Sequence, residues 1–196
     1  IALRPLDRDA VATLLRALAL DGLGDATRAP ALHRHTGGNP MYVLETLRAA
    51  LERPGSADAP WPHAPGVLRL IQQRLARLSP TALKIARCAA VAGPDFSPAL
   101  VARVLGAAPL DLADAWGELE SAQFLGARGF AHDLIAEAVQ AGLPAGVAEP
   151  LHAEVAARLD ETRAEPAHIA EHWLAAGEPM RAVPFLDDAA ARASAL

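Results

Sequence analysis

The sequence predicts a mainly all-α protein with one short β-hairpin. Of its 196 residues, 52% are hydrophobic but only 4% are aromatic, and alanine, the strongest helix former, is abundant. Apolar residues recur at the i, i+3, i+4, i+7 spacing of an amphipathic helix along most of the chain. Residues 124–132 are the exception, because glycines interrupt the pattern and favour two short strands around a turn. We therefore expect helices packed through small and aliphatic side chains, with a single hairpin.

The N-terminal part of the chain predicts three helices. Asp7 can cap a helix whose apolar residues lie on one face, and the glycines at 22 and 24 should end it. A second helix, at about 25–35, leads into Thr36-Gly37-Gly38-Asn39-Pro40. The two glycines of this segment permit a tight turn, and Pro40 suits the first turn of the next helix.

A stretch rich in proline follows. Residues 53–66 contain four prolines and two glycines, so neither a helix nor a central strand should persist through them. This stretch is the clearest predicted domain boundary.

The central part of the chain has the plan of a winged helix. Two helix starts use the same device, Ser79-Pro80 and Ser97-Pro98, with serine as the N-cap and proline at the first helical position. A third helix is expected at about 110–122, and the hairpin then turns at Ala127-Arg128-Gly129. Three helices followed by a hairpin are the elements of a winged helix.

Helical periodicity continues from residue 134 to the end. The last two helices, joined near Gly177, resemble one tetratricopeptide unit. Pro184 lies inside the second of them and should kink it or delay its start. Because repeat arrays need about three units for stability, and because the first residue is Ile1, we expect this chain to be the middle part of a longer protein.

Composition excludes several classes of protein. The single cysteine, Cys88, cannot form an internal disulfide and is expected in the core. No apolar run is long enough to span a bilayer, so a cytoplasmic location is expected. The only lysine, Lys84, has no glycine near it, so the chain lacks the G-x-x-x-x-G-K-[ST] phosphate-binding loop and we expect no enzyme activity or catalytic residues in it.

Two histidine motifs and one helix suggest other functions. His168-Ile169-Ala170-Glu171-His172 matches the H-x-x-E-H zinc pattern, but it adjoins Trp173 in a helix expected to be exposed and has no evident third ligand, so no metal site is predicted. His33 and His35 are expected to be solvated. A winged helix can bind DNA, yet the predicted third helix carries only acidic charges, and the chain has a net charge of −5; we do not expect direct nucleic-acid contact.

Three segments in order resemble one family. They are Thr36-Gly37-Gly38-Asn39-Pro40-Met41-Tyr42-Val43-Leu44-Glu45, Leu70-Ile71-Gln72-Gln73-Arg74-Leu75-Ala76-Arg77-Leu78-Ser79-Pro80 and Phe130-Ala131-His132-Asp133-Leu134-Ile135-Ala136-Glu137-Ala138. Together they resemble STAND-class AAA+ ATPases, including LuxR-type large ATP-binding regulators and cyclase-linked relatives. The resemblance implies a helical lid at 1–58, a winged helix at 59–143 and the start of a tetratricopeptide-like array at 144–196.

The resemblance also implies a nucleotide site. Gly38, Asn39 and Pro40 look like the lid element whose proline packs on adenine in this class. His132 lies in Ala131-His132-Asp133, which is similar to the MHD motif whose histidine reaches the β-phosphate of ADP; alanine stands where that motif has methionine. An ordinary turn and helix start, and a packing or capping histidine, are the alternative interpretations. ATP or ADP would be the cofactor of the intact protein, without tight binding to this part alone.

Two functions are consistent with these observations. The first is a regulatory middle part of a bacterial STAND ATPase in signal transduction or transcription control, which couples nucleotide state to domain orientation. Its partners would be an upstream P-loop domain of the same chain and a protein or small-molecule inducer bound through downstream helical repeats. The second is an independent helical interaction protein or a winged-helix DNA-binding protein.

Overall fold

The fold is mainly helical, as predicted. The computed structural model describes residues 5–18, 26–52, 60–62, 65–126 and 129–194. In this part of the chain it is 78% helical, with eleven α-helices and a short two-stranded antiparallel sheet. The chain divides into two compact units: unit 1 comprises residues 1–77 and 130–138, and unit 2 comprises residues 78–129 and 139–196. Each unit is described separately below.

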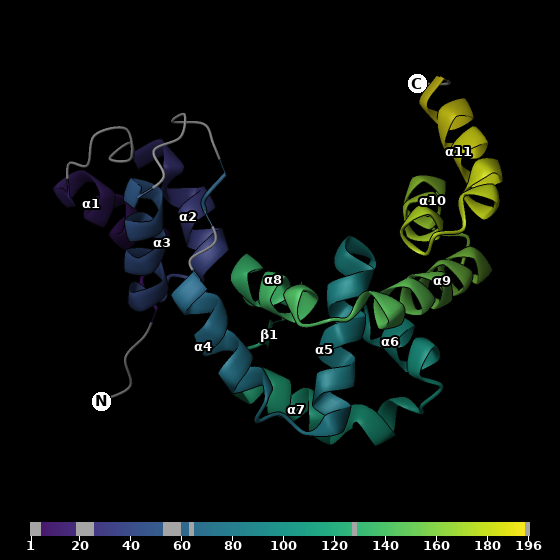
Figure 1. Cartoon of the computed structure of the whole chain (residues 1–196), viewed down its shortest axis with the longest axis horizontal. Coiled ribbons are helices and arrows are strands. Elements are labelled where there is room, and N and C mark those ends of the chain that lie inside the picture. Colours follow the sequence, from purple (N-terminus) through teal and green to yellow (C-terminus); the bar gives the residue numbers. More distant parts are fainter. Residues whose placement is uncertain (1–4, 19–25, 53–59, 63–64, 127–128, 195–196) are drawn as a thin grey trace. The chain divides into compact units, whose positions relative to one another are not determined.

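Unit 1 contains the N-terminal helices (Figure 1). They are α1 (Arg8–Leu18), the 3-10 helix η1 (Ala26–Arg28), α2 (Ala29–Thr36), α3 (Pro40–Glu52), α4 (Pro65–Leu75) and the first part of α8 (Asp133–Ala141). The Oδ1 atom of Asp7 accepts a hydrogen bond from the Ala10 amide at 2.8 Å, which confirms the predicted cap of α1.

The core of unit 1 forms where α1, α2 and α3 pack together. Its buried residues are Val11, Leu15, Ala29, Leu32, Val43, Leu47, Ala50 and Trp61. The Arg28 guanidinium carbon lies 3.9 Å from the ring centroid of Trp61. This contact places a positive charge over the face of the largest aromatic ring in the cluster.

Unit 2 contains the remaining elements. They are α5 (Pro80–Ala92), the 3-10 helix η2 (Gly93–Asp95), α6 (Pro98–Leu105), the 3-10 helix η3 (Pro109–Leu112), α7 (Ala113–Ser121), β1 (Leu125–Gly126), α9 (Ala145–Glu161), α10 (Pro166–Ala175) and α11 (Pro179–Ser194). Strand β1 pairs with β2 (Gly129–Phe130). The order of three helices and a strand pair is the order predicted for residues 80–130.

Both predicted serine caps are present. The Oγ atom of Ser79 accepts a hydrogen bond from the Ala82 amide, and Ser97 Oγ accepts one from the Leu100 amide, each at 3.2 Å. A proline occupies the first helical position in both cases. The serine side chains therefore satisfy amides that have no partner inside the helix.

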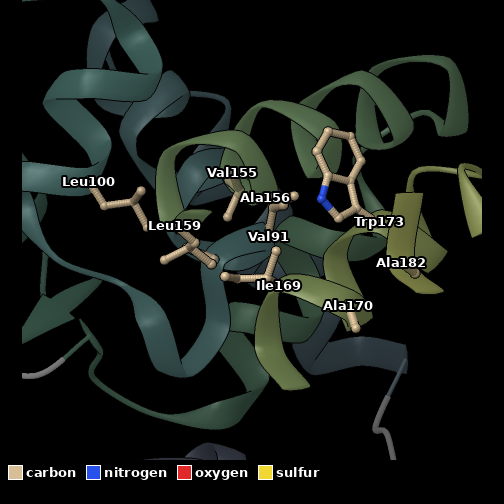
Figure 2. Close-up of a cluster of buried hydrophobic side chains, with 10 residues drawn as sticks. Val91, Leu100, Val155, Ala156, Leu159, Ile169, Ala170, Trp173 and Ala182 are labelled. Carbon is tan, nitrogen blue, oxygen red and sulfur yellow. The ribbon is translucent and has the colours of Figure 1, made fainter. Parts of the chain in front are cut away.

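The core of unit 2 joins α5 and α6 to the last three helices. Figure 2 shows Val91 of α5 and Leu100 of α6 beside side chains of α9, α10 and α11, with Trp173 as the only aromatic side chain labelled there. Cys88 is buried in α5, as predicted, and its burial raises the pKa of the thiol to about 11. It is therefore a core residue rather than a reactive thiol.

Of the two effects expected of Pro184, a delayed helix start is wrong, whereas a kink stays a prediction. Helix α11 begins at Pro179 and runs to Ser194 with Pro184 inside it, so this proline does not delay the helix. The Pro184 side chain is exposed, and α11 packs along α10; this packing supports the helix despite the missing amide donor. The helix predicted at 110–122 begins instead as η3, and α7 starts only at Ala113.

Some predicted features lie outside the described residues. They are the glycines at 22 and 24, most of the proline-rich stretch at 53–66, and turn residues 127 and 128. The division into a lid at 1–58, a winged helix at 59–143 and a repeat segment at 144–196 stays a prediction. The two compact units are a different division, which rests on contacts within the folded chain. No helix in the described ranges is both long enough and apolar enough to span a membrane.

Candidate functional site at the turn of residues 36–40 and His132

A tight turn connects α2 to α3. Gly37 and Gly38 both have positive φ angles, +62° and +71°, a backbone region that glycine enters without steric cost. The Thr36 hydroxyl donates to the Leu32 carbonyl at 2.7 Å and accepts from the Gly38 amide at 3.3 Å. Helix α3 then begins at Pro40, as predicted.

Asn39 caps α3, a role that its sequence pattern alone had not indicated to us. Its Oδ1 atom accepts hydrogen bonds from the amides of Met41 at 3.0 Å and Tyr42 at 3.4 Å. Asparagine is among the preferred N-cap residues, and an asparagine directly before a proline at the first helical position is a signal that could have revealed this cap.

Gly38 faces another segment of its own chain. The Leu6 amide donates to the Gly38 carbonyl at 2.8 Å, and a β-carbon at position 38 would come within 2.0 Å of the Leu6 carbonyl oxygen. This close backbone approach explains the glycine. Gly38 itself is buried, Asn39 is partly buried, and the Pro40 side chain is exposed.

His132 packs directly against the turn. A β-carbon at Gly37 would lie 2.6 Å from the Cδ2 atom of His132. The Tyr42 ring meets the His132 ring edge to face, with centroids 5.5 Å apart. The structure therefore brings together two motifs that are far apart in the sequence.

The His132 ring is neutral at pH 7. Its side chain is 9% exposed, and its pKa is lowered to about 4, mainly by burial and further by the charges of Arg74 and His35, while a hydrogen bond with the His35 backbone acts in the opposite direction. The Nδ1 atom is buried and has no hydrogen-bond partner within the described ranges. A buried polar atom in this state is a candidate for a ligand contact.

Charged groups of unit 1 surround this histidine. Arg74 of α4 donates to the Tyr42 hydroxyl at 3.3 Å, and His35 Nδ1 lies 3.7 Å from Glu137 Oε1. His35 is buried and His33 is partly buried, so the expectation that both are solvated is wrong. The residue that approaches His35 here, Glu137, belongs to α8 and lies about a hundred residues further along the chain. This long-range packing has no signal in the local sequence.

The second histidine motif has a different arrangement. His172 is 7% exposed, which corrects the expectation of an exposed helix, whereas Glu171 is exposed. His168 Nδ1 lies 2.8 Å from Asp95 Oδ1, and the Nδ1 atoms of His172 and His152 are 2.8 Å apart. These contacts connect α10 to η2 and α9.

These histidines do not form a metal cluster with their neighbours. Over the residues that the structure describes, no group of three or more His, Cys, Asp or Glu side chains is placed to hold a metal ion. His172 Nε2 is 4.0 Å from Asp95 Oδ2, too far for a direct hydrogen bond. The arrangement is that of a buried polar network between helices.

The third helix of the predicted winged helix, expected at about 110–122, is acidic in the structure as well. The charged residues of η3 and α7 are Asp111, Asp114, Glu118 and Glu120. Hydrogen bonds with the Ser79 side chain and with the Ser79 amide, which donates to Glu118 at 2.8 Å, lower the pKa of the Glu118 carboxyl. An acidic surface of this kind would repel the phosphates of a duplex.

The chain matches no protein-family model, no curated protein and no solved structure. The assignment of a function therefore depends on the residues and their geometry.

Proposed function

We propose that this chain is the regulatory part of a STAND-type ATPase, in which the turn at residues 36–40 and His132 form one side of a nucleotide site. The observation that carries the proposal is the contact of His132 with Gly37 and Tyr42 in unit 1. In the resemblance, these are the two motifs that contact the nucleotide. The contact of these two motifs within one compact unit supports this role. The contact itself is made by protein side chains alone.

The residues present fit ADP or ATP in two respects. The Nδ1 atom of His132 is a buried polar atom without a hydrogen-bond partner in the described part of the chain, and the Pro40 ring is exposed and can stack on a flat base. Gly38 is a poorer fit, because the Leu6 backbone already occupies the space beside it. A bound nucleotide would supply a phosphate anion for the histidine and an aromatic base for the proline.

The histidine can couple binding to protonation. Burial keeps the ring neutral, and a neutral imidazole donates through only one nitrogen. An anion beside Nδ1 would favour the protonated ring, in which both nitrogens donate, so it should raise the pKa of His132 above about 4. Binding of a phosphate would then take up a proton.

Helix α8 offers a route from the site to the rest of the chain. It begins at Asp133, directly after His132, and its residues 133–138 belong to unit 1 whereas 139–141 belong to unit 2. Nucleotide states that contact His132 differently would therefore act on a helix that both units share. Such differential contacts are what a conformational switch requires.

Titration of the purified chain with ADP tests the proposal. We expect weak binding, with NMR shifts at the amides of residues 37–39 and at the His132 ring, and no ATP hydrolysis. Affinity should increase between about pH 7.5 and 5.5 more for the native protein than for His132→Gln, which controls for protonation of ADP itself.

Three results would contradict the proposal. They are ATP turnover by the purified chain, ADP-induced shifts confined to unit 2, and equal pH dependence in the native protein and in His132→Gln. Protection of duplex DNA with a steep salt dependence would instead support the alternative of an independent winged-helix DNA-binding protein.

A further inference from the structure

Unit 2 contains a pocket that the proposed function does not use. Its volume is about 680 Å³, and it lies among the residues that connect η2 to α6, the start of α6, η3, α7 and β1. Pockets of roughly 300–1,000 Å³ are typical of small-molecule sites. The volume therefore suits a compact organic ligand.

The pocket walls are largely apolar and aromatic. The rings of Phe96 and Trp116 have centroids 5.8 Å apart with planes tilted by 57°, and Pro98, Pro109 and Leu125 also line the cavity. Trp116 is only partly buried, so its indole ring remains available for contact. Such walls favour a flat apolar group.

The described residues that line the pocket carry a negative charge. Glu120 contributes a carboxylate, and none of the described lining residues is Lys, Arg or His. The other charged residues of η3 and α7 are acidic as well: Asp111, Asp114 and Glu118. A carboxylate beside a tryptophan face attracts an organic cation through charge and through the ring quadrupole.

We propose that this pocket binds a small organic cation, an amine or guanidine attached to a flat apolar body. The apolar body lies against the adjoining rings of Phe96 and Trp116, and the cation pairs with Glu120. The same chemistry disfavours anions, including nucleotides, at this position. The pocket thus takes a different class of ligand from the site at His132. The proposal does not depend on the function proposed above.

Three ligands that share a phenylethyl body and carry a cationic, a neutral or an anionic head group test the proposal: 2-phenylethylamine, 2-phenylethanol and 3-phenylpropionate. The protein has three tryptophans, whose indole N–H signals can be followed separately by NMR after ¹⁵N labelling, with Trp116→Leu to assign the signal. We expect the amine to shift the Trp116 signal but not those of Trp61 and Trp173. The alcohol should bind more weakly, and the carboxylate should not bind.

Two variants test which side chains contribute to the affinity for the amine. Glu120→Gln should weaken amine binding about fivefold while affinity for the alcohol stays unchanged, since an exposed ion pair contributes up to about that factor. Trp116→Leu should weaken it about tenfold through loss of ring contact. Asp187→Asn, which removes an exposed carboxylate of α11 outside the pocket, should have no effect.

The proposal would be overturned by any of three results. The amine leaves the Trp116 signal unchanged at millimolar concentration, the carboxylate binds as well as the amine, or Glu120→Gln binds the amine with native affinity. Because Glu120 is exposed, this variant should fold, and the last result can be obtained even if Trp116→Leu does not fold.

Discussion

His132 lies so close to Gly37 that a β-carbon at position 37 would come within 2.6 Å of its Cδ2 atom. The contact joins the turn after α2 to the residue that precedes α8. It requires a residue without a side chain at position 37, and the φ angle of +62° adds a second requirement for glycine.

Gly37→Ala should therefore lower the free energy of unfolding by about 2 to 4 kcal/mol, through backbone strain and the clash with the ring. Gly106→Ala is a matched control, because Gly106 has a φ of +60° but no atom within 4 Å of the place that a β-carbon would take; it should cost about 1 kcal/mol. Urea unfolding measures both. Adding His132→Ala should recover part of the Gly37→Ala loss, and a purely additive double variant would contradict the contact.

Gly38→Ala should be more damaging than Gly37→Ala. The added carbon would lie 2.0 Å from the Leu6 carbonyl oxygen, a backbone atom that cannot rotate away, so we expect a loss of more than about 3 kcal/mol. In a chain that lacks residues 1–6, the Gly38→Ala change should lower the temperature of thermal unfolding much less than it does in the full chain. A His132→Ala change should give no such rescue, in contrast to the effect at position 37.

Stability should decrease between about pH 6.5 and 4. The pKa values of His132 and His172 are both lowered to about 4 from the ordinary value of 6.5, mainly by burial. The unfolded chain therefore takes up protons in this range while the folded chain does not, so the stability present above about pH 6.5 is lost as the pH falls. We expect a loss on the order of 1 to 3 kcal/mol per histidine in urea unfolding.

Three variants check the sign of this effect. His132→Gln and His172→Gln should each flatten the pH dependence, because the group that differs between the two states is gone. His168 acts in the opposite direction: the hydrogen bond with Asp95 raises its pKa above 6.5, so its contribution is full below that pH and is lost as the pH rises. Native stability should therefore also decrease as the pH rises above about 6.5. His168→Gln should remove this decrease without changing the loss between pH 6.5 and 4, and an unchanged profile above pH 6.5 would contradict the Asp95 contact.

Pro184→Ala should increase stability by about 1 to 3 kcal/mol. Pro184 lies in the interior of α11 and is exposed, so alanine restores an amide donor and removes a ring without losing buried contacts. Thermal unfolding followed by circular dichroism measures the gain. Pro179→Ala, at the first position of the same helix, should change stability little, because proline is well tolerated there.

Local signals in the sequence predicted the helix starts well. Asp7, Ser79 and Ser97 each cap the helix that they were expected to cap, since capping depends only on residues within one turn of each other. The turn at 36–40 was also predicted, except for the cap by Asn39. The burial of His35 and His172 was not predicted, because it depends on side chains brought from distant elements.

The candidate site was predictable only in part. Gly38, Asn39, Pro40 and His132 were selected by their resemblance to two motifs. Neither the approach of Leu6 to Gly38 nor the contact of His132 with Gly37 and Tyr42 could be derived from spacing.

The sequence alone determined that this chain is a set of amphipathic helices with a short strand pair and that its 196 residues contain no G-x-x-x-x-G-K-[ST] motif. These properties follow from periodicity, caps and composition, which act over a few residues. Only the tertiary structure decided that His132 is neutral, buried and beside the turn, and that Phe96, Trp116 and Glu120 line one pocket. Burial and electrostatic environment are set by residues distant in sequence, so they exist only once the chain is folded.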